Sequence, residues 1–279
     1  MKEKAILINM ADYEKSGEGA NGESVNHKAD KDIMLKLYFP GKIQQPLDEM
    51  HMALKVYQAG IPSPEPGEYV TDGNGRYGIR FRRINGKKSY ARACGDNPEM
   101  VPQYAEEFAR MCLDLHAIHV DRNLFESQKE RYCRLLAENP FYTTAEKAKI
   151  EKFILDSPDT DTAIHGDLQF GNALFSPEGR FFIDLGDFSY GYHLFDVGMI
   201  YLTCMVDGED FIQEAFHMNK ATAEEFWRHF APAYFGADRP LKDIEEEILP
   251  YSGLKTLIIE RDTKCRMPEL RRGLELILG

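Results

Sequence analysis

Three polar residues that are suited to phosphate chemistry lie close together in the second half of the sequence. Asp167 and Asn172 are five positions apart in the segment His165-Gly-Asp-Leu-Gln-Phe-Gly-Asn172, and Asp184 follows in the next apolar run. A carboxylate held beside a substrate hydroxyl can take its proton. An amide and a second carboxylate can hold Mg²⁺ through oxygen ligands, which this ion prefers. The pattern therefore predicts a base and a metal-binding pair within two neighbouring turns.

A glycine-rich segment near the N-terminus is the candidate for the phosphate-binding part of the same site. Gly17, Gly19 and Gly22 have the spacing Gly-x-Gly-x-x-Gly. In a dinucleotide-binding fold the third glycine would begin a helix, but the polar residues that follow Gly22 disfavour one. We therefore interpret the segment as a flap whose backbone N–H groups cover phosphates. An ordinary β-turn with glycines for positive φ is the alternative.

Lys36 and Glu49 are the candidates to complete the phosphate site. Lys36 lies on a predicted strand, residues 32–38, with its apolar neighbours on the opposite face because side chains alternate along a strand. Residues 45–60 have apolar side chains at helical spacing and end in glycine, which predicts a helix with Glu49 in its early turns. An ion pair between the two would hold the ammonium group in place. A solvated helix face is the alternative for Glu49.

The remaining segments indicate a mainly β first part and a mainly helical second part. Predicted strands cover residues 5–10, 24–28 and 32–38, and a hairpin is predicted over residues 68–84. Amphipathic periodicity predicts helices over residues 101–120, 125–138 and 144–155, with further helices after residue 202. We place a domain boundary after Ile84, so that residues 1–84 form one domain and residues 85–279 the other.

Composition and charge bound the class of protein. The chain has 279 residues, of which 43% are hydrophobic and 29% charged, as is ordinary for a globular protein. Its formal net charge of -12 argues against a nucleic-acid partner, and is compatible with a cationic small substrate or with solubility alone. The five scattered cysteines indicate neither a disulfide framework nor a zinc site. No apolar run is long enough for a membrane span or a signal peptide, so we expect a cytoplasmic protein with no membrane partner.

Together these motifs resemble the aminoglycoside phosphotransferase and choline kinase-like family, small-molecule kinases that share the protein-kinase fold. That family shows a His-Gly-Asp-x-x-x-x-Asn loop and then an Ile-Asp pair, matched here by residues 165–172 and by Ile183-Asp184. The resemblance implies an α+β, protein-kinase-like fold. Its N-terminal, nucleotide-binding lobe would be a small antiparallel β-sheet with one helix. Its larger, mainly helical C-terminal lobe would carry catalysis and acceptor binding.

The resemblance also implies a role for each matching residue. Asp167 would act as the catalytic base or orient the acceptor hydroxyl, and Asn172 and Asp184 would hold Mg²⁺ at the nucleotide phosphates. Lys36 would contact the α and β phosphates and would itself be held by Glu49. The glycine-rich segment would cover the phosphates from above.

Positions around these residues carry further expectations. We expect His165 to bond the loop backbone rather than act as a base, and Asp196 to hold the catalytic loop from the following helix. Asp187 is expected near the site. Arg82 and Arg83 stand where the family often has an acidic residue. Both ATP and GTP therefore stay open as the nucleotide.

The predicted function is Mg²⁺-dependent transfer of the γ-phosphate of ATP or GTP to a hydroxyl of a small molecule, such as an aminoglycoside, an amino alcohol or a sugar-like compound. Asp207, Glu209 and Asp210 could meet a cationic acceptor or form a solvated face. Two alternatives stay open: a kinase of a protein or lipopolysaccharide acceptor, and a catalytically silent nucleotide-binding module. The sequence does not indicate an oligomeric state.

Overall fold

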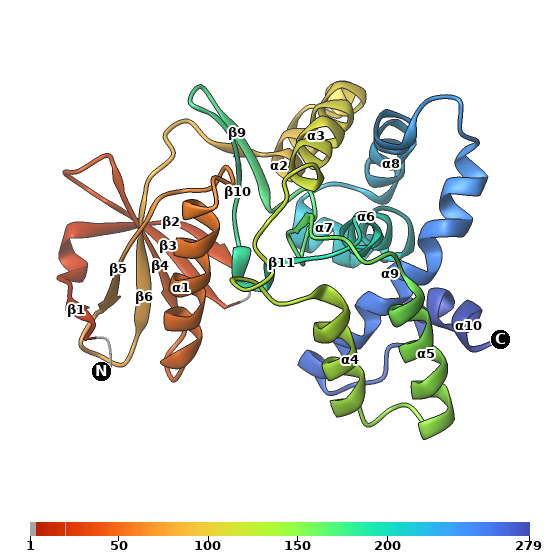
Figure 1. The fold of residues 1–279 in the computed structure, drawn as a ribbon. Coiled ribbons are helices and arrows are strands. Elements are labelled where there is room, and N and C mark those ends of the chain that lie inside the picture. Colours follow the sequence, from red (N-terminus) through yellow and green to blue (C-terminus); the bar gives the residue numbers. More distant parts are fainter. Residues whose placement is uncertain (1–3, 20) are drawn as a thin grey trace. The chain divides into compact units, whose positions relative to one another are not determined.

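The computed structural model describes residues 4–19 and 21–279. The chain divides into two units that are not contiguous in sequence (Figure 1). The first unit contains Met1–Lys88 and Leu174–Gly186, and the second contains Ser89–Ala173 and Asp187–Gly279.

A six-stranded sheet forms most of the first unit, in the order β1-β5-β6-β4-β3-β2. Its strands are β1 (Ile6–Leu7), β2 (Tyr13–Gly19), β3 (Gly22–His27), β4 (Ile33–Tyr38), β5 (Pro66–Thr71) and β6 (Tyr77–Arg82). All neighbours pair antiparallel except β1, which runs parallel to β5. One helix, α1 (Gln44–Gln58), packs against β5 and β6. The expected small sheet with one helix is therefore present, with a short parallel edge strand added.

The alternation of side chains along β4 decides what faces the helix. Leu35 and Leu37 are fully buried in a cluster with Val25 and Val70 on one face. Tyr38, on the other face, is buried with Met50 of α1. Because Lys36 lies two positions before Tyr38, it shares the helix-facing side of the strand. The predicted orientation of Lys36 is thus confirmed.

The glycine-rich segment is not the loop after a strand at residues 5–10 that the sequence predicts. Only Ile6 and Leu7 of the apolar residues 5–10 pair in the sheet. The strand before the glycines is instead β2, whose sequence Tyr-Glu-Lys-Ser-Gly-Glu-Gly is polar and mostly exposed. An edge strand has no second neighbour to cover it, so charged residues are favoured there and the hydrophobic pattern is lost. The glycines therefore belong to the paired ends of a β-hairpin rather than to a loop that interrupts the chain.

A second hairpin is formed by β9 (Ala173–Ser176) and β10 (Gly179–Phe182). Because it belongs to the first unit, the two units are not separated by one boundary after Ile84. The carboxylate of Glu178 accepts from the Arg82 guanidinium at 2.7 Å and from the Asn85 N–H at 3.1 Å. The N–H of Phe182 donates to the carbonyl of Pro62 at 2.8 Å. These bonds attach residues 174–186 to the first unit, although they follow the loop of residues 165–172 in sequence.

The second unit is mainly helical. Its helices are α2 (Tyr90–Asp96), α3 (Val101–His116), α4 (Gln128–Glu138), α5 (Thr144–Asp156), α6 (Leu194–Tyr201), α7 (Glu209–Phe216), α8 (Lys220–Phe235), α9 (Leu241–Thr263) and α10 (Arg272–Leu278), with a π-helical turn at Leu202–Val206. Strand β8 (Ala163–Ile164) pairs with β11 (Ser189–Tyr190), and β7 (Lys88–Ser89) lies where the chain passes from one unit to the other. The helix predicted to reach residue 120 ends at His116, because Ile118 and Val120 bond to the backbone of residues 161–163 instead.

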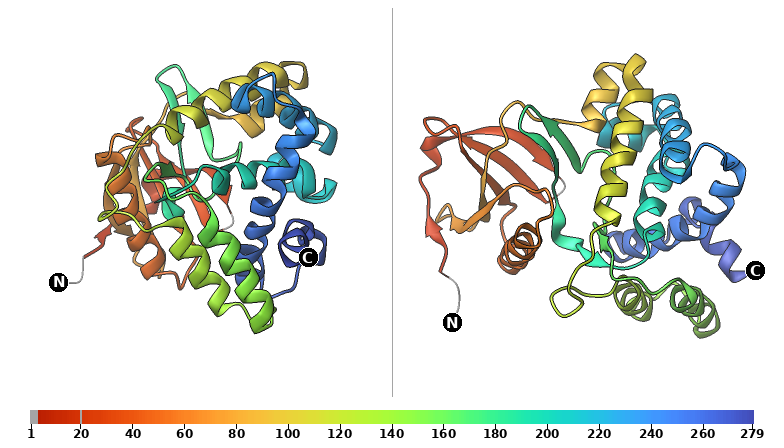
Figure 2. Two further views of the ribbon diagram at one scale, coloured as in Figure 1. Left: turned by 45° about the vertical axis from the view of Figure 1, so that its right-hand side comes forward. Right: turned by 45° about the horizontal axis from the view of Figure 1, so that its top comes forward.

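Two helix pairs form the centre of this unit. Helices α3 and α8 lie side by side (Figure 2). The ring of Phe108 on α3 packs against those of Phe226 and Phe230 on α8. Helix α6 packs along α9. No helix in the part of the chain that the structure describes is both long and apolar enough to cross a membrane.

Candidate functional site

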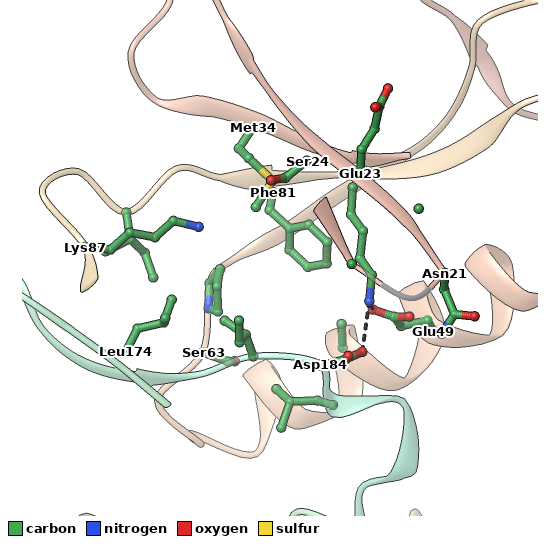
Figure 3. Close-up of a pocket in the computed structure, with 18 of the residues that line it drawn as sticks. Asn21, Glu23, Ser24, Met34, Glu49, Ser63, Phe81, Lys87, Leu174 and Asp184 are labelled. Atoms are coloured by element: carbon green, nitrogen blue, oxygen red, sulfur yellow. Dashed lines mark hydrogen bonds and ion pairs between the residues drawn. The ribbon is translucent and has the colours of Figure 1, made fainter. Parts of the chain in front are cut away.

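A cavity of about 240 Å³ opens in the first unit (Figure 3). Its walls come from the β2–β3 hairpin, β4, α1, the connections around β6, and residues 174–185. Glu49 and Asp184 lie together at one side of it, and Lys87 and Leu174 lie at the other (Figure 3). The cavity therefore has a polar end, where Glu49 and Asp184 lie.

Lys36 is the cation of the polar end. Its Nζ lies 2.7 Å from Oε1 of Glu49 and 2.9 Å from Oδ1 of Asp184. Burial by itself would lower the pKa of Lys36, but the two carboxylates outweigh it and the pKa is raised. The structure thus brings together three of the residues expected at a phosphate site, with the lysine held in its charged form.

Glu49 does not lie on a solvated helix face. Its side chain is 11% exposed, and its second carboxylate oxygen accepts from the hydroxyl of Tyr38, which lies two residues beyond Lys36 on β4. Both carboxylate oxygens of Glu49 are therefore engaged by β4.

Asp184 has an unusual backbone. Its φ is +61°, a left-handed value that an aspartate tolerates better than most residues do. Strained backbone of this kind is characteristic of functional sites, where the surrounding structure imposes it. Its side chain remains 48% exposed, so the carboxylate can reach a ligand.

The three glycines differ in their relation to the cavity. Gly19 and Gly22 line it from the ends of β2 and β3, whereas Gly17 does not line it. Gly17 stands instead where the pairing of β2 with β3 shifts register after Lys15. Two of the three predicted glycines are thus in place to approach a ligand, and the third has a local role in the hairpin.

The cavity also offers apolar side chains against which a flat ring could pack. Phe81, Ile84 and Leu174 contribute these side chains, and Ser63 and Lys87 contribute polar ones. A purine base has a flat aromatic ring of this kind. Leu174 comes from β9, and sequence reasoning did not single it out.

The second unit contains the loop of residues 165–172. It begins where β8 ends, and it is held internally by Asn172, whose Nδ2 donates to Oδ2 of Asp167 at 3.0 Å and to the Asp167 carbonyl at 2.9 Å. Asn172 is 7% exposed. The spacing of five residues thus does bring the predicted base and the predicted amide ligand into contact.

Asp196, at the start of α6, holds this loop by its backbone. It is fully buried, and its two oxygens accept from the N–H groups of His165 at 2.7 Å and Gly166 at 2.8 Å. Burial by itself would raise the pKa of Asp196, but the hydrogen bond with His116 outweighs it and the pKa is lowered. The predicted contact between Asp196 and the loop is therefore present, and Asp196 is ionised at neutral pH.

His165 and His116 both have structural partners. Nδ1 of His165 accepts from the N–H of Asp167 at 3.3 Å. Nε2 of His116 lies 3.2 Å from Asp196, and its Nδ1 lies 2.6 Å from the hydroxyl of Tyr234, which also lies 2.9 Å from Nδ1 of His193. Burial and the neighbouring His116 lower the pKa of His193 to about 4, so this ring is neutral at pH 7. These contacts extend the support of the loop to α8.

The acidic residues after α6 do not form one solvated face. Glu209 and Asp210 are exposed, but Asp207 is 8% exposed. Burial raises the pKa of Asp207 to about 6, against the opposing charge of Lys220. Only part of the predicted solvated cluster is therefore present.

Three supporting residues were not singled out by sequence reasoning. Arg131 of α4 pairs with Asp187, and Tyr234 of α8 contacts His116. Lys255 of α9 donates to the carbonyl of Gly166 at 2.8 Å. Lys255 could have been found from its place in the run Leu254-Lys-Thr-Leu257, because a charged residue among apolar residues of a helix needs a partner when it is buried.

A sequence model of the phosphotransferase enzyme family (APH) matches residues 19–230, which is more than half of the chain. This range contains Gly19, Gly22, Lys36, Glu49, the loop of residues 165–172, and Asp184, and it begins after Gly17. Among curated proteins, none matches the sequence.

Solved structures share the fold. A thermostable mutant of aminoglycoside phosphotransferase APH(4)-Ia, in ternary complex with ADP and hygromycin B, has 14% identity and a TM-score of 0.63, covering 96% of this chain and 93% of that chain. An amicoumacin kinase in complex with AMP-PNP has 16% identity and a TM-score of 0.57, covering 98% and 90%. A choline/ethanolamine kinase family protein from Mesorhizobium loti has 16% identity and a TM-score of 0.53, covering 96% and 92%. The protein-kinase-like fold is thereby confirmed.

Proposed function

The chain belongs to the phosphotransferase enzyme family, and we propose that it moves the γ-phosphate of ATP or GTP to a hydroxyl group of a small molecule, with Mg²⁺. The observation that carries this proposal is the ammonium group of Lys36 at the cavity, held between the carboxylates of Glu49 and Asp184 at 2.7 and 2.9 Å. A pre-positioned cation is what the oxygens of a nucleotide phosphate require.

In this proposal the first unit binds the nucleotide. The base would lie against apolar side chains of the cavity, which include Phe81, Ile84 and Leu174. The phosphates would lie at the polar end, under Gly19 and Gly22, with Lys36 at the α and β phosphates. The nucleotides ADP and AMP-PNP that accompany the similar solved structures support a nucleotide here.

The residues proposed as Mg²⁺ ligands have suitable chemistry. Asp184 offers a carboxylate, and Asn172 offers an amide oxygen, since its amide nitrogen donates to Asp167. Both are hard oxygen donors, and a magnesium site commonly has one or two protein ligands with phosphate oxygens and water completing the shell. When bound, Mg²⁺ would neutralise negative charge on the phosphates.

Asp167 is the residue we assign to the acceptor. Its carboxylate would accept the proton of the substrate hydroxyl as the hydroxyl oxygen bonds to the γ-phosphorus. The bond from that phosphorus to the bridging oxygen of the nucleotide breaks in the same transfer, and the diphosphate leaves. The hydrogen bond from Asn172 at 3.0 Å fixes one oxygen of Asp167.

The acceptor is proposed to be a small hydroxyl compound that binds to the second unit. The similar proteins include an aminoglycoside phosphotransferase, an amicoumacin kinase and a choline/ethanolamine kinase family protein. Aminoglycosides, amino alcohols and sugar-like compounds are therefore the first classes to screen.

The test is nucleoside diphosphate release, measured with Mg²⁺ and ATP or GTP in the presence of pools of these compounds. We expect at least one pool to raise turnover above the rate with water. With an acceptor identified, Asp167→Asn should lower turnover by about 10²- to 10⁴-fold, while nucleotide affinity changes by no more than about threefold, because the lost group handles only the acceptor proton.

Asp159→Asn is the matched control, because Asp159 is an exposed aspartate that pairs with Arg122 at the surface. It should leave turnover unchanged. Undiminished turnover in Asp167→Asn would remove the assignment of the base. If a protein or lipopolysaccharide acceptor, and no small molecule, raised turnover, the proposed acceptor class would be wrong.

A further inference from the structure

Lys255 is a buried cation of the second unit that has no role in the proposed chemistry described above. It lies on α9, its side chain is 1% exposed, and its Nζ donates to the carbonyl oxygen of Gly166 at 2.8 Å. That oxygen belongs to the peptide group that joins Gly166 to Asp167. Taking an ammonium group out of water is costly, so a lysine in this position requires strong local compensation.

Asp196 and His165 also hold the backbone of residues 165–167, through its N–H groups. Asp196 accepts the N–H groups of His165 at 2.7 Å and Gly166 at 2.8 Å, and His165 Nδ1 accepts the N–H of Asp167 at 3.3 Å. The peptide group between Gly166 and Asp167 therefore has its oxygen bound by Lys255 and its N–H bound by His165. Its plane is determined by two side chains, and that plane sets the direction in which the Asp167 side chain leaves the backbone.

Close packing of two helices places the two opposite charges around the loop. Gly198 of α6 lies so near α9 that a Cβ there would come within 2.7 Å of the backbone carbon of Tyr251. Asp196 is two residues before Gly198, and Lys255 is four residues after Tyr251. The contact between α6 and α9 thus brings Asp196 and Lys255 to the loop from two elements.

The lysine is charged in this environment. Burial by itself would lower its pKa, but the neighbouring Tyr132 and the carboxylates of Asp196 and Asp167 outweigh burial and raise the pKa. The ammonium group also lies 5.6 Å from the centre of the Tyr132 ring, within the range of a cation–π contact.

From this geometry we infer that Lys255 is a positioning residue for the proposed phosphoryl transfer: through the Gly166 carbonyl it fixes the peptide that carries Asp167, with Asp196 as the opposing charge. The inference rests on the proposed function for its catalytic part. Its structural part, that Lys255 orders the loop, stands independently of any activity.

The test compares Lys255→Met, which keeps the length and burial of the side chain without its charge, with Thr256→Val on the same helix. The hydroxyl of Thr256 donates to the Leu270 carbonyl, away from the loop. We expect Lys255→Met to lower turnover on the order of 10- to 100-fold, the scale of a small misplacement of a reacting group, with the nucleotide KM changed by no more than about twofold. Thr256→Val should leave turnover unchanged.

Amide hydrogen exchange of residues 163–172 supplies a readout that needs no activity. In Lys255→Met these amides should exchange about tenfold or more faster, while in Thr256→Val at the same temperature they should not. If Lys255→Met is not folded, Lys255→Gln, which keeps a neutral donor, is used for both measurements. Unchanged exchange and turnover would overturn the inference, as would equal effects in the two helix variants. If the wild-type chain transfers no phosphate and the amides of residues 163–172 still exchange faster in Lys255→Met, the proposed function is wrong and the loop contact is established.

Discussion

Lys36 keeps its positive charge at the cavity, where a ligand can reach it. Two carboxylates keep it charged, so it is ready for phosphate oxygens. One of these carboxylates, Asp184, is also the proposed metal ligand. A bound nucleotide and its metal ion would therefore compete for the 2.9 Å contact between Lys36 and Asp184, whereas the contact between Lys36 and Glu49 can persist.

Lys36→Met tests this division of roles at the level of the residue. Removing the cation leaves the carboxylates of Glu49 and Asp184 without the ammonium group between them, so their negative charge should repel phosphates. We expect nucleotide affinity, measured by equilibrium titration, to fall at least about tenfold, the size of one charge-assisted interaction. Lys152→Met, at a position with 74% side-chain exposure, is the control and should bind normally. Equal affinity in the two variants would show that the cavity does not hold phosphates at Lys36.

At the scale of elements, the contact between α6 and α9 is the one on which the second half of the site depends. Glycine in a helix interior is normally unfavourable relative to alanine by about 1 kcal/mol. At Gly198 the absence of a side chain is instead required by the approach of the Tyr251 backbone. Intrinsic helix propensity and packing therefore oppose each other at this residue, and packing decides.

Gly198→Ala should accordingly destabilise the protein, by about 1–3 kcal/mol, the usual cost of overpacking. Urea denaturation gives this free energy of unfolding. Gly208→Ala is the matched control, because no atom lies within 4 Å of a Cβ built there and its φ is negative. Because Gly208 is the N-cap of α7, where alanine is less favourable than glycine, this change should cost no more than about 1 kcal/mol. A stabilising Gly198→Ala would mean that the helices can separate without cost.

At the scale of the whole molecule, the pH dependence of folding reports on Asp207. Its carboxyl pKa is about 6 in the folded chain, against 3.8 for the ordinary side chain. Between these values the folded state keeps a proton that the unfolded state has lost. The stabilisation that Asp207 gives the folded state is thus fully present below pH 4 and is lost as the pH rises through 6. The stability lost between these pH values is about 3 kcal/mol at most.

Asp207→Asn should therefore make the chain more stable than the wild type at pH 8 and leave it nearly equal at pH 4. Urea denaturation at the two pH values measures the difference. Asp210→Asn, at an exposed neighbouring position, should change stability by about 0.5 kcal/mol or less at both. A gain for Asp207→Asn that is equal at pH 4 and pH 8 would show that its charge is not the cause.

Local periodicity and contacts between near neighbours were enough to predict several features from the amino-acid sequence. The helix predicted over residues 45–60 is α1, and alternation along β4 was enough to place Lys36 on the side of Glu49. The contact between Asp167 and Asn172 follows from a turn of five residues. The motif spacing, through the resemblance that it carried, also anticipated Asp196 beneath the loop.

The remaining features arise between residues far apart in the chain, so they become visible in the folded protein and not in the sequence pattern. The polar edge strand β2 has no hydrophobic pattern to reveal it. Residues 174–186 join the first unit through contacts with residues 62–85 that no local signal records. Lys255 reaches Gly166 across 89 positions, and it does so only because the glycine at position 198 lets α6 and α9 approach each other closely.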